Sequence, residues 1–175
     1  MPAAPSIENY YIGKGIVSFK KDGEPSFVDC GNVPEFEFTP AIEKLEHFSS
    51  RQGVKSKDRT IVVSKSGAIR MVMEEWNARN LAIALLGEVD ENTAGQEVID
   101  IFASNAVSGT LKFTGTNEVG PKWELIFNKV DFIPGSSVSM LSDEWGQLEI
   151  NGDVSAVNGS FGTATRIGGE SDASE

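Results

Sequence analysis

The single histidine and the single cysteine are the residues best suited to chemistry in this 175-residue chain. A Ser-His-Asp or Cys-His catalytic arrangement would have to use His47. His47 lies in a polar segment beside Phe48 without a suitably spaced partner nearby, so we interpret it as a surface or interface residue. Cys30 precedes Gly31 at the end of an expected strand, which favours packing as a small hydrophobe. One Cys and one His also cannot complete a structural zinc site.

Carboxylate pairs and glycines form no better catalytic centre. Glu74-Glu75 and Asp143-Glu144 are sequence neighbours, and neighbours on a strand point to opposite faces, so neither pair naturally shares a site. Asp90-Glu91-Asn92 offers oxygen ligands for calcium, but it lacks the spacing of an EF-hand loop and is more typical of a solvated loop. Gly13-Lys14-Gly15 indicates a bulge or a close backbone approach. We therefore expect no enzyme, no metal and no cofactor.

Composition and charge favour a structural or binding role. The chain is 39% apolar and 23% charged, which is typical of one soluble globular domain. We expect no membrane segment, because no apolar run reaches the ~18 residues of a membrane span. The net charge of −11 argues against binding nucleic acid through its phosphates. It fits either high solubility or a surface that repels a polyanion, and charge alone does not decide between them.

Alternating apolar and polar residues predict a mainly β protein. Val17 and Phe19 share one side of a strand, and Phe36 and Phe38 oppose two glutamates on another. We expect strands over residues 11–20, 33–38, 59–65, 68–75, 97–103, 107–114, 122–132, 137–141, 146–154 and 159–166. Gly and Asn mark most of the boundaries. Short strands at this spacing favour a β-sandwich or a barrel.

One helix and one long loop complete the expected elements. Asn77 can cap a helix over residues 78–86, and Gly87 follows where a left-handed residue is expected. Residues 39–58 form a charged excursion between strands, and loops of about 20 residues are usually functional or disordered. Two well-patterned strands, separated by Ser66-Gly67, follow the excursion. Because the excursion leads directly into them, we expect a partner to order it.

Three stretches in and after the excursion resemble the major tail tube proteins of long-tailed, non-contractile bacteriophages. They are LEHFSSR at 45–51, GVKSKDRT at 53–60 and NLAIALLG at 80–87. The segments WGQLEINGDV at 145–154 and NGSFGT at 158–163 are similar to the closing strands of that family. Together the stretches cover roughly residues 10–167, and the central ones are the more specific.

The resemblance implies both a fold and an assembly. It implies a β-sandwich or partial barrel with one flanking α-helix and a long inter-strand loop. It also implies that six copies of the subunit form a ring. Rings would stack into a hollow tube in the virion tail, with the tape measure, tail tip and tail terminator proteins as partners. The subunit would be made in the host bacterial cytoplasm, and DNA would pass through the lumen. The expected organisation is a flexible N-terminal arm at 1–8, a tail tube domain at 9–167 and a disordered acidic tail at 168–175.

Two sets of functional residues follow. Mixed charges around apolar anchors in the excursion fit a contact between subunits. The predicted subunit contacts are Glu43, Leu45, Glu46, His47, Phe48, Arg51, Lys55, Lys57, Asp58 and Arg59. Carboxylates on the lumen wall would repel DNA phosphates. The predicted lumen residues, whose alternative is a position facing outer solvent, are Glu35, Glu37, Glu74, Asp100, Glu124 and Glu149.

Three other functions remain open. The tube protein of a contractile or secretion-type injection machine would share the architecture but would also bind a sheath. A monomeric β-sandwich module for sugar or protein would need an exposed aromatic platform, for which Trp76, Trp123 and Trp145 are candidates. Core or interface positions are the simpler interpretation of these tryptophans. A hydrolase that uses His47 is the most distant alternative.

Overall fold

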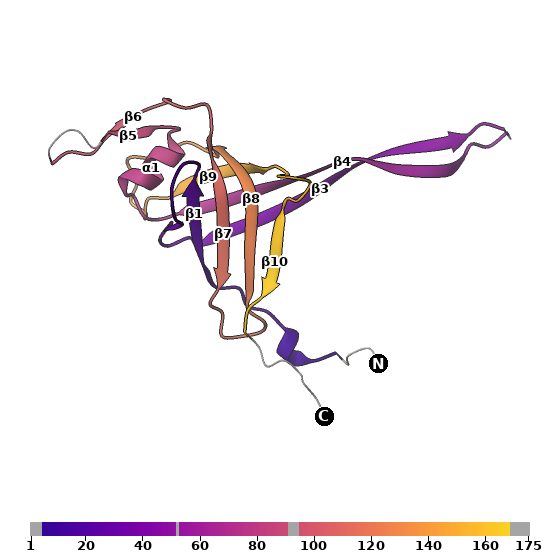
Figure 1. Ribbon diagram of the computed structural model, residues 1–175, viewed down its shortest axis with the longest axis horizontal. Helices are drawn as coiled ribbons and strands as arrows, with labels where there is room; N and C mark the ends of the chain where they lie inside the picture. The colour runs from indigo at the N-terminus through magenta and orange to yellow at the C-terminus, as the bar shows by residue number, and fades with distance from the viewer. Residues whose placement is uncertain (1–4, 52, 91–94, 169–175) are drawn as a thin grey trace.

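The protein is mainly β, as the alternation of its residues predicts (Figure 1). The computed structural model describes residues 5–51, 53–90 and 95–168. The helices are η1 (Ile7–Asn9, a 3-10 helix) and α1 (Ala78–Ala84). The strands are β1 (Gly15–Lys21), β2 (Val28–Asp29), β3 (Glu35–Ser49), β4 (Ser56–Met73), β5 (Glu88–Asp90), β6 (Val98–Asp100), β7 (Val107–Gly115), β8 (Trp123–Pro134), β9 (Leu148–Val154) and β10 (Gly162–Arg166). Within these ranges, no helix is long and apolar enough to span a bilayer.

Eight strands form one open antiparallel sheet that divides at β8. The strand order is β2-β1-β7-β8-β9-β4-β3, and β10 lies beside β8. The first part of β8, residues 123–127, pairs with β10, whereas residues 130–134 pair with β9. Both parts pair with β7 on the other side. The sheet bends at this strand and acquires a sandwich-like form, with β1, β7 and β10 on one side and β9, β4 and β3 on the other (Figure 1).

The core lies between the two sides of the bent sheet. Phe36 of β3 stacks on Phe113 of β7 with ring centroids 5.6 Å apart, although three strands separate β3 and β7 in the sheet order. Phe38 approaches Phe127 of β8 in the same way, at 4.9 Å. The alternation is confirmed at all the inward positions of β1 and β4 that it predicts, namely Val17, Phe19, Ile69, Met71 and Met73, which are buried.

Helix α1 begins at the residue that the sequence predicts. The Asn77 side chain accepts a hydrogen bond from the Asn80 backbone N–H at 2.8 Å, which confirms the predicted N-cap. The helix ends at Ala84, and the left-handed residue after it is Leu86, with φ of 51°. The prediction for Gly87 is therefore wrong. A glycine is needed there for space, since a Cβ would lie 2.6 Å from Ile99 Cγ2.

An ion pair ties α1 to the turn after β1. Arg79 binds both carboxylate oxygens of Glu24, and its Nη2 also donates to the Phe19 carbonyl at 3.0 Å. The hydrogen bonds from Arg79 lower the pKa of Glu24 below its ordinary value. The pair holds the helix against β1 at the end of the core.

Residues 39–58 are not the loop that their polar composition predicts. β3 and β4 run through this segment as paired strands, from Glu35 opposite Val72 to Ser49 opposite Ser56. Ser66 and Gly67, expected to separate two strands, lie inside β4. The apolar alternation is missing because neither face of these strands is buried, so no face has to be apolar. We call residues 40–66 the projecting hairpin.

Smaller differences concern the loops and the chain ends. Residues 137–141, expected as a strand, belong to the β8–β9 loop, in which Val138 packs partly buried against the core while Met140 and Leu141 are exposed. Residues 88–90, expected as a loop, pair with β6. The part of the expected N-terminal arm that is described includes Ser6, which caps η1. The expected acidic tail lies outside the described residues apart from Gly168.

Candidate functional site

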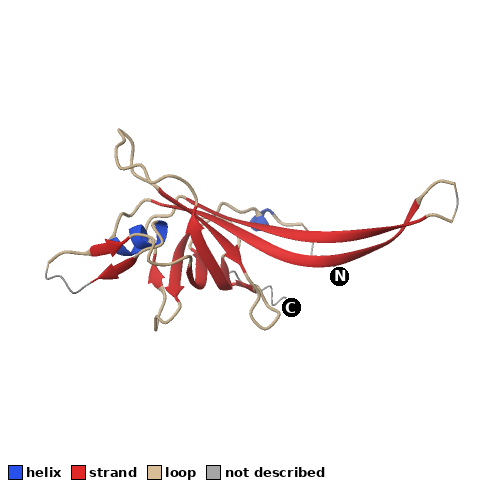
Figure 2. Cartoon of the chain, turned by 90° about the horizontal axis from the view of Figure 1, so that it is seen from above, coloured by secondary structure: helices blue, strands red, loops and turns tan. Residues whose placement is uncertain are grey.

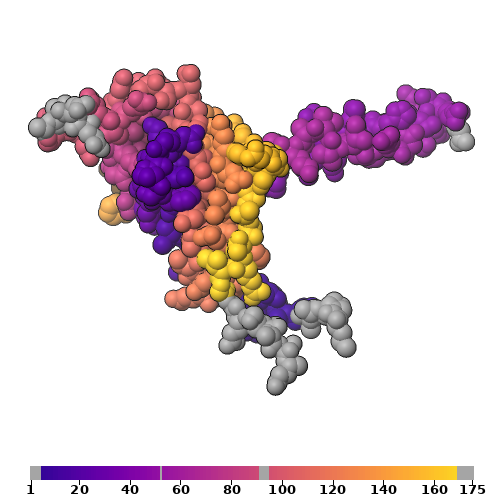
Figure 3. Space-filling model, in the orientation of Figure 1, coloured from indigo at the N-terminus to yellow at the C-terminus, as the bar shows by residue number. Residues whose placement is uncertain are grey.

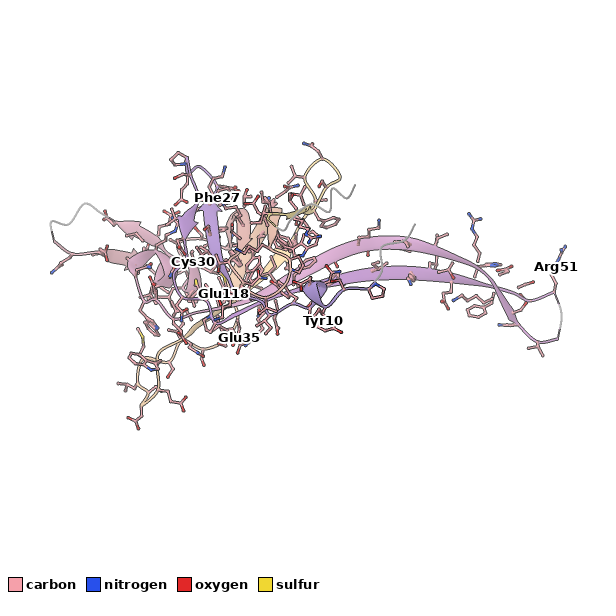
Figure 4. All side chains as sticks on the ribbon, turned by 90° about the horizontal axis from the view of Figure 1, so that it is seen from below. Tyr10, Phe27, Cys30, Glu35, Arg51 and Glu118 are labelled. Carbon is pink, nitrogen blue, oxygen red and sulfur yellow. The ribbon has the colours of Figure 1, made fainter. Side chains whose placement is uncertain are left out.

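The projecting hairpin leaves the body as an isolated two-stranded ribbon (Figures 1 and 3). Every β4 residue from Ser56 to Ser66 is exposed, and burial begins at Gly67, where β9 starts to pair with β4. Figure 4 places Arg51 at the far tip and Glu35 beside the body. A ribbon of two strands is marginally stable alone in water. Its extension away from the body therefore indicates a surface meant for contact.

Two β-bulges give the ribbon its curve (Figure 2). Val63 and Asp58 are extra residues in β4, at the register shifts opposite Glu43/Lys44 and His47/Phe48. A bulge bends its strand, increases the local twist and redirects a side chain. Asp58 accordingly reaches His47, with Oδ1 and Nδ1 2.6 Å apart.

Both faces of the ribbon expose apolar side chains. Leu45 and Ile61 are opposite each other on one face and are 59% and 45% exposed. The other face carries Ile42, Phe48 and Val62, which are also exposed. Contiguous exposed apolar surface on a soluble protein marks interaction sites. Ile61 and Val62 were not predicted as contacts, because the strand pattern of residues 59–65 points to burial in a core. Ile42 lies in the segment expected as a loop and was also not among the predicted contacts.

One face of the ribbon contains a shallow depression, which we call the hairpin groove. It is lined by Leu45, His47, Asp58, Arg59 and Ile61. Leu45 and Ile61 form its apolar part, while Arg59 and the His47–Asp58 pair form its polar part. The groove combines a flat apolar surface with a cation, which suits an aromatic or carboxylate-bearing partner.

All ten predicted subunit contacts lie on the projecting hairpin and are exposed. Four of them line the hairpin groove, and Phe48 lies on the opposite face. Lys57 pairs with Glu46 on that opposite face, and Glu43 accepts a hydrogen bond from Ser64 Oγ at 3.0 Å. Arg51 and Lys55 belong to the tip. The structure thus brings the predicted contacts onto one element but distributes them over both of its faces.

The hairpin differs in charge from the rest of the chain. It holds six of the 15 Lys and Arg residues but only three of the 26 Asp and Glu residues. Its net charge is therefore +3, and the remainder carries −14, which together give the overall −11. Opposite charges on two surfaces of one molecule favour contact between one surface of a copy and the other surface of the next.

Three of the six predicted lumen residues gather around one cation. Arg70 Nε donates to Glu149 Oε1 at 2.7 Å, and its Nη1 pairs with Glu35 and lies 4.0 Å from Glu37. The hydrogen bonds that Arg70 donates, first to Glu35 and then to Glu149, raise the pKa of Arg70. The other three predicted lumen residues are dispersed: Glu74 accepts from Gln147 at 3.2 Å, Asp100 lies on β6, and Glu124 lies on β8.

The candidates for catalysis do not form an enclosed centre. His47 does have a carboxylate partner, Asp58, which the sequence spacing did not suggest, but the pair lies on the exposed ribbon. Cys30 is buried, as predicted, and burial raises its pKa to about 12. Among residues 5–51, 53–90 and 95–168, no three His, Cys, Asp or Glu side chains are placed to hold a metal ion.

We expect the Cys30 thiol to be inert in the native protein. The thiolate is the reactive species, and both its burial and its raised pKa suppress it. Labelling with a chromogenic disulfide at pH 8 should be at least about 100-fold slower than labelling of the urea-unfolded chain, because the reaction then requires opening of the core. Equal rates for the two states would contradict this placement.

The three tryptophans occupy different environments, and none is in the core. Trp76 and Trp123 are partly exposed, whereas Trp145 is almost fully exposed. The interpretation as core residues is therefore wrong for all three, while interface positions stay open. Gly146 next to Trp145 packs against the Trp76 ring, since a Cβ there would lie 2.8 Å from Trp76 Nε1.

Comparison with known proteins finds a family model that matches this chain. Residues 10–98 match the family model described as Protein of unknown function UCP028589. The matched region spans just over half of the chain and includes the whole projecting hairpin and α1. No curated protein matches the chain.

Proposed function

This chain belongs to the family Protein of unknown function UCP028589, and we propose that it is a structural subunit that joins copies of itself through the projecting hairpin. The observation that carries this proposal is a long ribbon with exposed apolar residues on both faces. Leu45 and Ile61 on one face, and Phe48 on the other, would be buried by neighbouring copies. Burial of such residues is the main favourable term in association.

A second copy is the partner that the charges favour. The body is strongly acidic, so two bodies repel each other, whereas the basic hairpin is attracted to another body. A contact between two different surfaces of identical copies is heterologous, and such contacts produce closed rings or open filaments. The outer edge of β3 is the end of the sheet in the described chain, so it is also open to pairing with a strand of a neighbour.

The specific assembly that we propose is a phage tail tube. Its support is the resemblance of residues 45–60, 80–87 and 145–163 to tail tube proteins, together with the sandwich-like bent sheet and its one helix. Six copies would form a ring, and rings would stack into a virion tail tube around the tape measure protein, between tail tip and tail terminator proteins. The carboxylates around Arg70 would keep DNA phosphates from binding as the genome passes.

Negative-stain electron microscopy of the purified protein tests this function. We expect rings or tubes that become more abundant as the protein concentration rises, since assembly is driven by mass action. A protein that stays monomeric under every assembly condition, including the presence of tail-initiating partners, would contradict the proposal.

A further inference from the structure

We infer that the β8–β9 loop, residues 135–147, receives the projecting hairpin of another copy, with Trp145 placed in that copy's hairpin groove. This inference rests on the proposed function and adds the identity of the second surface. Self-assembly through the hairpin alone leaves open which part of the neighbour it touches. Three features of the loop identify it as that surface: its exposed apolar side chains, its firmly held base and its acidic charge.

The β8–β9 loop presents large apolar side chains to solvent. Leu141 is 93% exposed, Trp145 is 91% exposed and Met140 is 69% exposed. Tryptophan is among the residues most enriched at the energetic centres of interfaces. A cluster of this kind on a soluble chain marks an interaction surface.

The loop base is held firmly enough to present Trp145 in a fixed position. Gly146 packs directly against the Trp76 ring, and Gln147 Nε2 donates to Glu74 Oε1 at 3.2 Å. Within the loop, the Glu144 N–H donates to Ser142 Oγ at 3.0 Å. A side chain that is already positioned loses less conformational freedom on binding than one on a free loop.

The hairpin groove complements this loop in shape and in charge. Its Leu45–Ile61 surface is apolar and can accept one face of an indole, and Arg59 lies beside it. The loop carries Asp143 and Glu144 directly before Trp145 and contains no Lys or Arg. A docked Trp145 would therefore bring these carboxylates to the basic hairpin, where charge pairing would select the orientation.

The groove is filled from another copy, not from its own body. Pairing of β4 with β9 begins only at Gly67, and the groove residues lie farther out on the ribbon. The space-filling view shows the hairpin standing clear of the body (Figure 3). Insertion of an exposed apolar side chain into a depression elsewhere on an identical molecule is a heterologous contact, which continues from copy to copy.

Exchange of charges across the contact tests the inference. Glu144→Arg would place a cation beside Arg59 of the neighbouring copy. It should raise the concentration needed for assembly by about tenfold or more, as expected for a change at an interface centre. Adding Arg59→Glu to that variant should restore assembly to within about threefold of wild type, because the opposite pair is re-formed. Trp145→Ala should raise the concentration by at least about tenfold. Assembly is followed by light scattering over a concentration series.

Two controls separate this contact from general effects. Glu118→Arg changes the net charge by the same amount at another exposed site and should leave assembly within about twofold of wild type. Trp123→Ala removes a tryptophan from β8, and circular dichroism checks that this variant is folded. It should also leave assembly within about twofold of wild type. If wild type assembles, and Trp145→Ala and Glu144→Arg both assemble as well as wild type, the inference fails and the proposed function stands. If wild type never assembles, the proposed function fails as well.

Discussion

A chain in which residues 43–64 are replaced by an Asn-Gly turn is expected to fold normally and to remain monomeric where wild type assembles. Ile42 and Lys65 are opposite each other, so a two-residue turn can close the shortened hairpin in register. Stability should be retained because β4 is buried only from Gly67 onward. Sedimentation velocity measures the loss of assembly, and a melting temperature within a few degrees of wild type shows that the body is intact.

A shorter deletion, of residues 43–57, serves as a second variant. It keeps the paired residues Ile42 and Lys65 and leaves residues 58–64 as the connection between them. The same monomeric behaviour is expected, because the strand that carries Leu45 and His47 is lost. Tube formation by either shortened chain would show that the hairpin does not join the copies.

Phe132→Ala is expected to destabilise the fold by about 3–5 kcal/mol, the cost of deleting a large buried aromatic side chain. Phe132 is fully buried and packs edge to face on Phe19, with ring centroids 5.0 Å apart. For a chain of this length the melting temperature should fall by about 10 °C. Urea unfolding followed by tryptophan fluorescence measures the change in free energy.

Phe48→Ala is the matched control for that core variant. Phe48 is 47% exposed on the projecting hairpin, so its removal should change the free energy of unfolding by no more than about 0.5 kcal/mol. The contrast tests the separation of the protein into a body that supplies stability and a ribbon that supplies contacts. Equal losses for the two variants would mean that the hairpin packs against the body.

The sequence predicts those parts of the fold in which one face of an element is buried. The alternation at Val17 and Phe19, and again at Ile69 and Met71, is confirmed because these residues face the core. The Asn77 cap is confirmed because it depends on local hydrogen bonds. The bend at β8 could not be predicted, since the exchange of partners from β10 to β9 is a tertiary event on a strand that has one continuous pattern.

Within the projecting hairpin, the strand expected over residues 59–65 is confirmed as part of β4, whereas the segment up to residue 58 was expected as a loop. A strand with both faces in solvent has no apolar periodicity, so the segment resembles a loop in its composition. The types of its residues nevertheless favoured a contact surface, and the ten residues predicted for it all lie exposed on the hairpin. The contact itself stays a prediction. The groove itself depends on the Leu45–Ile61 register and on the bulge at Asp58, neither of which composition specifies. The cluster around Arg70 joins residues far apart in sequence, so local sequence patterns could not predict it.

Electron microscopy of the purified wild-type protein tests directly whether the subunit forms a tube. We expect hollow rings with six subunits in end-on class averages and stacked tubes in side views at higher concentration. Particles that remain single bodies at every concentration and in the presence of tail-initiating partners would contradict this expectation.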